Sequence, residues 1–233
     1  MRFNRLIYSL ISIAFLSISA SLSLVVAAER ASNNAAPVRI VALGDSLTAG
    51  YQLPRNDAFP VQLEAALRKK GYNVIVMNSG VSGDTAAAGL ERLAWSLPDK
   101  FDAVILELGA NDALRGLSPA VTKHALQDIV QKLKARNAEI LIAGMQAPTS
   151  YGTDYVESFN DIFPSIAKDY NLLLYPFFLK GVALRPDLSL SDGLHPNKKG
   201  VAKIVQNILP KVEELVKLVY KKKRFEIKRA ELN

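Results

Sequence analysis

Short apolar runs alternate with longer amphipathic stretches along most of the chain. The apolar runs are rich in Val, Ile and Leu, which is typical of strands that are buried on both faces of a sheet. Between them, apolar residues recur at spacings of three and four, which predicts amphipathic helices. The predicted strands are residues 38–43, 73–77, 101–108, 138–145 and 171–177, and the predicted helices are residues 58–70, 85–96, 118–136, 155–169 and 197–220.

This alternation of strands and helices predicts an α/β protein with three layers, α/β/α, around a five-stranded parallel sheet. No internal repeat and no low-complexity linker follows Pro37. We therefore expect one domain, residues 29–210, with residues 211–233 as a basic C-terminal helix end and tail. Ligands of such sheets gather beyond the carboxyl ends of the strands, so candidate functional residues are sought directly after the predicted strands.

The first 28 residues have the layout of a secretory signal peptide. Arg2 and Arg5 precede an uncharged stretch that ends in small residues at Ala27 and Ala28. A basic start, an apolar middle and small residues at the exit predict cleavage and a periplasmic or secreted protein. The uncharged stretch is also long enough to span a bilayer, so a retained N-terminal anchor is the alternative. The absence of cysteine excludes disulfides and a lipid anchor on cysteine.

The net charge of +7 is concentrated at the two ends of the chain. Residues 211–233 carry eight basic and four acidic side chains and residues 1–28 carry two basic ones, which leaves a net charge of +1 for residues 29–210. A nearly neutral body gives no support to a nucleic-acid partner, and we expect none. We interpret the basic tail at residues 221–229 as a solvated helix end, and the alternative is weak attachment to anionic lipid head groups.

Two polar tetrads contain the residue types of nucleophilic catalysis. Gly-Asp-Ser-Leu at residues 44–47 follows a predicted strand, and Asp-Gly-Leu-His at residues 192–195 lies in a loop-like segment. A serine hydroxyl attacks a carbonyl effectively only when a neighbouring imidazole takes its proton. A carboxylate bonded to the other ring nitrogen fixes the tautomer of that imidazole. Ser46, His195 and Asp192 are therefore candidates for nucleophile, base and orienting carboxylate.

The chain has only two histidines, which limits the choice of base. His124 lies within a predicted helix, where the apolar spacing favours a solvated surface position. His195 is surrounded by Ser, Asp, Gly, Pro and Asn, a composition typical of loops that carry catalytic groups. Taken singly, either tetrad is equally compatible with ordinary turn chemistry.

Two further segments follow predicted strands and are suited to stabilising negative charge. Residues 78–85, Asn-Ser-Gly-Val-Ser-Gly-Asp-Thr, contain small residues that let a backbone amide approach a ligand closely. Residues 109–112, Gly-Ala-Asn-Asp, offer an asparagine whose amide nitrogen can donate to an oxyanion.

The order of these four blocks closely resembles that of the SGNH (GDSL) hydrolase family, in particular its small periplasmic arylesterase, acyl-CoA thioesterase I and lysophospholipase group. The likeness covers roughly residues 38–209 and includes residues 111–116, which read like the substrate-side loop of that group. It implies a flavodoxin-like fold, with Ser46 as nucleophile, His195 as base and Asp192 as its orienting group.

The resemblance also implies an oxyanion hole made of the backbone amides of Ser46 and Gly83 with the side chain of Asn111. The implied activity is hydrolysis of aryl esters, acyl-CoA-type thioesters and lysophospholipids through an acyl-enzyme. We expect neither a metal nor an organic cofactor, and a monomer. Asp45 is expected to stabilise the turn by hydrogen bonding and not to carry protons. Candidate acyl-chain contacts, equally compatible with ordinary packing, are Leu114, Tyr151, Tyr155 and Phe178.

Other functions are less compatible with the sequence. A G-x-S-x-G nucleophile elbow is absent, and the Ser-x-x-Lys at residues 165–168 has no Lys-Thr-Gly partner. Two isolated histidines and no cysteine form no recognisable metal-ligand cluster. The glycine-rich residues 80–83 lack the lysine of a phosphate-binding loop. The alternatives that remain are a carbohydrate O-acetyl esterase with the same site and a non-catalytic envelope binding protein.

Overall fold

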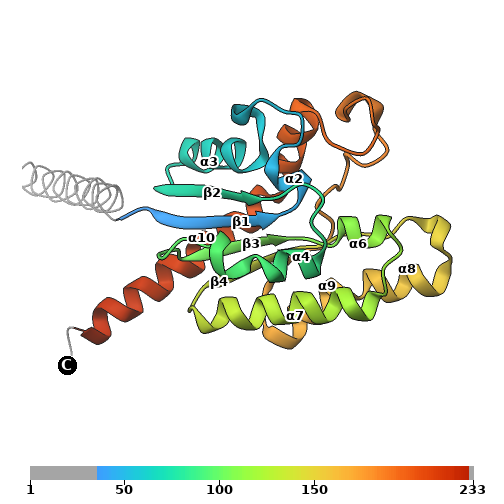
Figure 1. Cartoon of the computed structure of the whole chain (residues 1–233). Helices are drawn as coiled ribbons and strands as arrows, with labels where there is room; N and C mark the ends of the chain where they lie inside the picture. The colour runs from blue at the N-terminus through green and yellow to red at the C-terminus, as the bar shows by residue number, and fades with distance from the viewer. Residues whose placement is uncertain (1–35, 231–233) are drawn as a thin grey trace, which may run out of the picture. The chain divides into compact units, whose positions relative to one another are not determined.

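The computed structural model describes residues 36–230 of the chain. Their five strands form one parallel sheet in the order β2-β1-β3-β4-β5 (Figure 1). The strands are β1 (Val38–Gly44), β2 (Val74–Gly80), β3 (Ala103–Glu107), β4 (Glu139–Ala143) and β5 (Leu173–Tyr175). All five lie within or beside the predicted runs, so the prediction of a five-stranded parallel sheet is confirmed.

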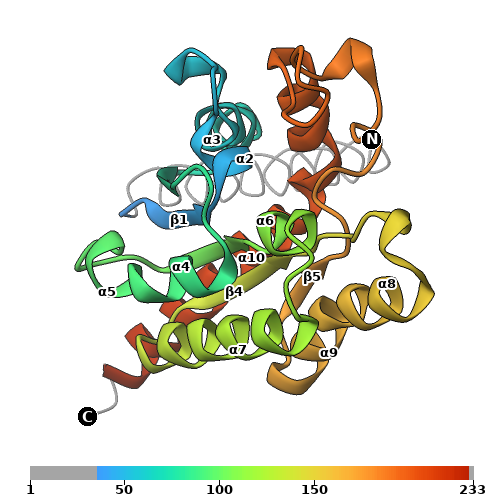
Figure 2. The same ribbon diagram turned by 45° about the vertical axis from the view of Figure 1, so that its right-hand side comes forward.

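Helices cover both faces of this sheet and complete the predicted α/β/α arrangement. One face is covered by α3 (Phe59–Lys69) and α10 (Lys198–Ala230), and the other by α4 (Ala86–Glu91), α7 (Pro119–Ala135) and α9 (Ile162–Tyr170) (Figure 1, Figure 2). The shorter helices are α2 (Ser46–Ala49), α5 (Leu93–Ser96), α6 (Ala110–Leu114) and α8 (Thr153–Asn160), and the 3-10 turns are η1 (Arg55–Asp57), η2 (Thr149–Tyr151) and η3 (Pro186–Leu188).

Two predicted helices are each divided in the structure. The helix expected at residues 155–169 is split into α8 and α9 at Asp161, because Pro164 in the first turn of α9 has no N–H to continue the ladder of α8. The helix expected at residues 85–96 is split into α4 and α5 at Arg92. The break lies at an arginine whose side chain is buried. The periodicity of apolar residues does not predict a buried arginine at this position.

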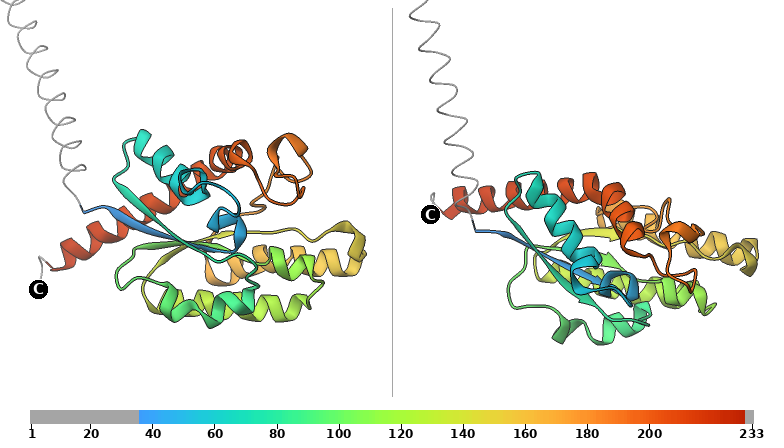
Figure 3. Two further views of the ribbon diagram at one scale, coloured as in Figure 1. Left: turned by 45° about the horizontal axis from the view of Figure 1, so that its top comes forward. Right: turned by 90° about the horizontal axis from the view of Figure 1, so that it is seen from above.

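The last helix is longer than predicted. It was expected to end near residue 220, but α10 continues to Ala230 and crosses the domain boundary expected at residue 210. The buried side chains beyond that boundary are Val212, Leu215, Val216 and Val219, all part of the hydrophobic core. Their spacing of three and four residues explains why this stretch packs on the sheet while the following turns are exposed (Figure 3).

The central strands are buried on both faces, as their composition predicted. Every residue of β3 is buried, and in β1 only Arg39 is exposed. The predicted signal peptide, residues 1–28, lies outside the described residues. Within residues 36–230, no helix combines the length and the apolar character needed to cross a bilayer.

The strand order determines where a ligand site can form. The chain passes from β1 to β2 on one side and then crosses to β3 on the other side of β1. Such a reversal of strand order predicts a ligand crevice at the carboxyl ends of β1 and β3. Ser46 directly follows β1, the glycine-rich segment follows β2 and Asn111 follows β3. The fold therefore brings three of the four predicted blocks to one edge of the sheet.

Candidate active site

A tight turn after β1 presents the predicted nucleophile, Ser46. The Asp45 carboxylate caps α2 by accepting a hydrogen bond from the N–H of Leu47 at 2.9 Å, and Gly50 ends the helix in the left-handed region at φ 84°. Gly44 is needed where strand and turn meet, because a Cβ there would lie 2.2 Å from Thr48 Oγ1. The turn therefore fixes the Ser46 side chain at the strand end, where it is 8% exposed.

The structure brings Ser46, His195 and Asp192 into one hydrogen-bonded chain. His195 Nε2 lies 2.9 Å from Ser46 Oγ, although the two residues are 149 positions apart. On the other side of the ring, Nδ1 lies 2.6 Å from Asp192 Oδ2. This arrangement fits a neutral imidazole that donates to the carboxylate from Nδ1 and accepts the serine proton at Nε2.

The Asp192 carboxylate is held in its charged form. It accepts hydrogen bonds from the backbone N–H groups of His195 at 3.0 Å and Leu194 at 2.9 Å. The backbone N–H of His195, then its ring, then the N–H of Leu194 lower the pKa of Asp192 to about 2. An ionised carboxylate at neutral pH can stabilise an imidazolium that forms on His195.

Tyr51 packs against the imidazole, a contact that the sequence did not predict. The ring centroids of Tyr51 and His195 are 4.4 Å apart, with the planes tilted by 36°. Tyr51 lies five residues after Ser46, at the turn that ends α2, and is 39% exposed. The only signal in the sequence for this ring contact was the position of Tyr51, close to the candidate nucleophile.

The segment after β2 presents Gly83 in a conformation that favours glycine. Its φ is +89°, while a Cβ would meet nothing closer than Arg115 Nη2 at 3.9 Å, so backbone conformation and not space requires glycine here. Arg115 Nη2 donates to the Gly83 carbonyl at 2.9 Å and holds the peptide in place. Among residues 36–230, neither the backbone N–H of Gly83 nor that of Ser46 has a hydrogen-bond acceptor.

Asn111 connects the nucleophile turn to this segment. Its Nδ2 donates to Asp45 Oδ2 at 3.1 Å and to the Asp84 carbonyl at 3.0 Å. Both amide protons therefore have partners in the structure. An oxyanion bound here would share one of these protons with Asp45 Oδ2 or with the Asp84 carbonyl.

Two buried charged residues that the sequence analysis missed hold these segments together. Arg92, 5% exposed, forms an ion pair with Asp84 and donates from Nη2 to the carbonyls of Gly44 and Ser79, both at 2.9 Å. Asp112, 1% exposed, accepts hydrogen bonds from the Ala86 N–H and from Thr122 Oγ1, both at 2.9 Å. The adjacent Asn111 drew attention to this block, but no pattern indicated that Asp112 anchors α4.

A third missed residue, Glu107, lies fully buried beneath the nucleophile turn. Its Oε2 accepts a 2.6 Å hydrogen bond from Thr48 Oγ1 and a 3.4 Å one from the Asp45 N–H, while Oε1 has no partner among the described residues. Burial, then the charge of Asp45, raises the pKa of Glu107 well above its ordinary value. Burial also raises the pKa of Asp45, to about 6. An acidic residue that directly follows four apolar residues in the predicted strand was the available signal.

Comparisons with known proteins identify the family of this chain. The profile of the GDSL-like Lipase/Acylhydrolase family matches residues 42–203. The chain belongs to this family. It is therefore a hydrolase that acts on ester bonds, as the four sequence blocks predicted.

Relatives of this GDSL-like hydrolase cover most of its length. An arylesterase of Vibrio mimicus is 38% identical over 77% of this chain and 88% of the relative. Thioesterase 1/protease 1/lysophospholipase L1 of Escherichia coli (strain K12) is 38% identical over 78% of this chain and 86% of the relative. The crystal structure of AlinE4, an SGNH-hydrolase family esterase, is similar with a TM-score of 0.66 at 45% identity, covering 77% of this chain and 97% of AlinE4.

Three of the four predicted acyl-chain contacts of this hydrolase lie near one another. Leu114 and Tyr151 are 48% and 43% exposed, and the Tyr151 hydroxyl donates to the Leu114 carbonyl at 2.8 Å. The ring of Tyr155 lies 5.2 Å from that of Tyr151 and is partly buried. These three side chains surround the end of α6, the helix that contains Asn111.

The prediction that Phe178 contacts an acyl chain is wrong. Phe178 is fully buried and packs edge-on against Phe59, with ring centroids 5.0 Å apart. Its aromatic ring is part of the hydrophobic core, where a substrate cannot reach it. In contrast, the prediction that His124 is a helix-surface residue is confirmed, since it is exposed on α7 and lies 3.8 Å from Asp128.

Proposed function

We propose that this hydrolase cleaves carboxylic esters and thioesters through an acyl-enzyme on Ser46. The observation that carries the proposal is the 2.9 Å contact between Ser46 Oγ and His195 Nε2, with Asp192 2.6 Å from the opposite ring nitrogen. His195 Nε2 takes the serine proton while Oγ attacks the carbonyl carbon. The tetrahedral intermediate collapses, and the leaving alcohol or thiol departs with that proton.

Hydrolysis of the acyl-enzyme follows the same proton route in reverse. A water molecule attacks the acyl carbon while His195 Nε2 takes its proton. Collapse of the second tetrahedral intermediate breaks the bond to Oγ, and Ser46 recovers a proton from the imidazolium. The acid is released and the resting state is restored without any other reactant.

We assign the oxyanion hole to the backbone N–H groups of Ser46 and Gly83 with the side chain of Asn111. Both backbone groups lack an acceptor among the described residues, which leaves them available to a substrate oxygen. Donors fixed in place before the reaction stabilise the charge that develops on the former carbonyl oxygen. The Arg115 contact to the Gly83 carbonyl supports such fixed placement.

The proposed substrates are aryl esters, acyl-CoA-type thioesters and lysophospholipids. Exposed apolar side chains lie on the loops and short helices around Ser46 and could contact an acyl or aryl group: Tyr51, Leu114, Tyr151 and Leu194. The relatives named arylesterase and thioesterase 1/protease 1/lysophospholipase L1 support this range.

The remaining proposals concern the whole chain. We propose that residues 1–28 are removed as a signal peptide and that the enzyme acts as a monomer in the periplasm or outside the cell. The support for these two proposals is the sequence pattern described above. We also propose that the hydrolase domain expected at residues 29–210 extends further along α10, because Val212, Leu215, Val216 and Val219 belong to the same hydrophobic core. N-terminal sequencing of protein from the periplasm would test cleavage, and a retained Met1 would contradict it.

A series of substrates at matched concentration tests the catalytic proposal. The series compares p-nitrophenyl acetate, butyrate and octanoate with an acyl-CoA, a lysophospholipid and acetyl-xylan. Exchange of Ser46 for Ala is expected to lower kcat at least about 10⁴-fold for every active substrate, with unchanged circular dichroism. Full activity of Ser46→Ala would contradict the assignment of the nucleophile, and a preference for acetyl-xylan would favour the O-acetyl esterase alternative.

A further inference from the structure

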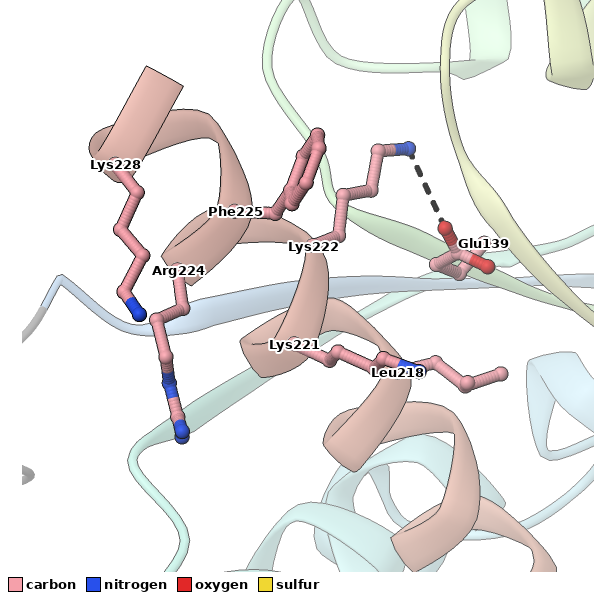
Figure 4. A pocket seen from close by; sticks show the side chains of 7 residues that line it. All are labelled: Glu139, Leu218, Lys221, Lys222, Arg224, Phe225 and Lys228. Atoms are coloured by element: carbon pink, nitrogen blue, oxygen red, sulfur yellow. Dashed lines mark ion pairs between the residues drawn. The ribbon is translucent and has the colours of Figure 1, made fainter. Parts of the chain in front are cut away.

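The exposed end of α10 combines cationic and apolar side chains on one stripe. Leu218, Lys221, Phe225 and Lys228 recur at spacings of three and four residues, so they lie on one side of the helix, and Arg224 borders them. With Lys222 and Glu139 they line a shallow depression of ≈ 560 Å³ (Figure 4). We refer to Leu218, Lys221, Arg224, Phe225 and Lys228 as the α10 patch.

We propose that the α10 patch docks the enzyme on an anionic lipid surface and holds the active-site edge away from that surface. Phe225 is 69% exposed and Leu218 is 39% exposed. Large apolar side chains next to lysine and arginine are the combination that amphipathic helices use at the boundary of head groups and acyl chains.

The basic residues of this helix end divide into two groups. Lys222 Nζ lies 3.4 Å from Glu139 Oε1, and Lys223 Nζ lies 2.8 Å from Asp102 Oδ1. These two pairs hold the helix against the start of β4 and the residue before β3. Lys221, Arg224 and Lys228 have no ion-pair partner among residues 36–230, and all three are exposed. Their charge is therefore available to a partner.

The chemistry of the α10 patch favours a lipid surface over a nucleic acid. Near an anionic membrane, each basic side chain strengthens binding about fivefold, and a bilayer interface accepts a neighbouring phenylalanine at the same time. Nucleic-acid binding would require a broader basic surface, but the net charge of residues 29–210 is only +1. Three free cations with two exposed apolar side chains therefore match an anionic bilayer best.

The sheet sets the direction in which a docked enzyme would face. Glu139 is the first residue of β4 and Asp102 precedes β3, so the α10 patch lies at the amino ends of the strands. In Figure 2 the start of β1 and the C-terminal turns of α10 lie on the same side, away from the strand ends that carry α2 and α6. Ser46 is separated from this edge by the seven residues of β1, or about 20 Å.

That separation decides which substrates a docked enzyme can reach. An interfacial helix sinks about 5–10 Å into the head-group region, which is less than the length of β1. The active site would then face the aqueous space. A docked enzyme would hydrolyse dissolved esters or thioesters and not the lipids directly beneath it.

Vesicle sedimentation tests the docking surface. The protein would begin at Glu29, because the described core lies within residues 38–230 and the apolar stretch before residue 29 would itself attach to lipid. Binding to phosphatidylglycerol vesicles is expected to exceed binding to phosphatidylcholine vesicles and to weaken as salt is raised. In the triple variant K221Q/R224Q/K228Q, the affinity for phosphatidylglycerol is expected to fall about 10²-fold.

A matched control removes the same charge at the opposite edge. R55Q/K123Q/K199Q changes three cations beside or within the first turns of α3, α7 and α10, which begin at the active-site edge. Its affinity for the vesicles is expected to stay within about threefold of the parent protein, because these side chains lie beyond the reach of a screened surface charge. Equal losses in the two triple variants would overturn the proposal, as would binding to DNA without binding to vesicles.

Tryptophan quenching by brominated phosphatidylglycerol tests the orientation. The chain has one tryptophan, Trp95, so a W95F background makes each new tryptophan a single probe. We expect strong quenching in W95F/F225W and little in W95F/L114W, because Leu114 follows β3 at the opposite edge. Quenching of the Leu114 probe as strong as that of the Phe225 probe would overturn the orientation. Neither measurement reads out hydrolysis, so failure here leaves the catalytic proposal untouched.

Discussion

The two edges of the sheet use ionisable side chains in opposite ways. At the carboxyl edge, Asp45, Glu107 and Arg92 are buried and bonded to backbone or hydroxyl groups around Ser46. At the amino edge, Lys221 and Arg224 extend into solvent from the last turns of α10. Catalysis needs atoms held at fixed separations, whereas attraction to a surface needs only charge and reach. Substitutions at the first edge should therefore have much larger effects.

Exchange of Asn111 for Ala should give the largest effect among the residues that support Ser46. Loss of one oxyanion donor is expected to lower kcat about 10²- to 10³-fold with little change in KM. Steady-state kinetics with p-nitrophenyl butyrate and thermal unfolding would be measured together. A small kinetic effect with a large fall in Tm would instead assign Asn111 a structural role, through its contacts to Asp45 and Asp84.

Exchange of Glu107 for Ala should cost about 2–4 kcal/mol of unfolding free energy. The change leaves the Thr48 hydroxyl without its buried acceptor and creates a cavity beneath the nucleophile turn. Glu107→Gln keeps both the volume and an acceptor oxygen, so we expect a cost below about 1 kcal/mol at pH 5. Urea unfolding of both variants measures the difference, and equal costs would contradict the role of the acceptor.

The same residue predicts a pH dependence of stability. Because burial raises the pKa of folded Glu107 above its ordinary value of 4.5, the folded chain binds more protons than the unfolded chain above pH 4.5. Stability should therefore fall as the pH rises through this window toward the folded pKa. Glu107→Gln removes this contribution, so it should gain stability relative to the parent between pH 5 and pH 8. If the difference in unfolding free energy between Glu107→Gln and the parent protein does not change with pH, Glu107 is ionised in the folded state.

Exchange of Tyr51 for Ala should have a smaller effect on catalysis. An aromatic contact is worth about 0.5–1.5 kcal/mol, so loss of the ring beside His195 should lower kcat/KM about two- to tenfold. Tyr51→Phe keeps the ring and serves as the control, with an expected change below about twofold. If both variants lose activity equally, the hydroxyl and not the ring would be the important group.

At the amino edge, exchange of Lys223 for Gln should have the smallest effect. Its ion pair with Asp102 is partly exposed and is worth about 0–1 kcal/mol. Activity toward a dissolved ester should be unchanged, because the pair lies at the far ends of the strands from Ser46. A loss of activity larger than that of Tyr51→Ala would show that the two edges are coupled.

Much of the fold could be predicted because its signals are local. The strand runs and the helical spacings lie within single segments, and all five strands were found to within a few residues. The breaks at Arg92 and Asp161 were missed, since a helix-like spacing continues through both. The extension of α10 beyond residue 220 was missed because the basic composition of residues 221–229 suggested a frayed end.

The candidate site was less completely predictable. Ser46, Asp192 and His195 are identified by their residue types and by the blocks around them. Glu107 and Arg92 act through partners that lie far away in the sequence, such as Thr48 and Gly44. Their contacts arise only when β1, β2 and β3 are placed side by side.

The sequence by itself determined the order of strands and helices, the four chemical blocks and the concentration of positive charge at the ends, because short-range spacing and residue chemistry specify these properties. Tertiary structure decided that Tyr51 packs on His195, that Phe178 belongs to the core and that Glu107 lies beneath Ser46. The physical reason is that these contacts depend on how distant segments pack, and a strand that is apolar on both faces does not reveal which neighbour each side chain will meet.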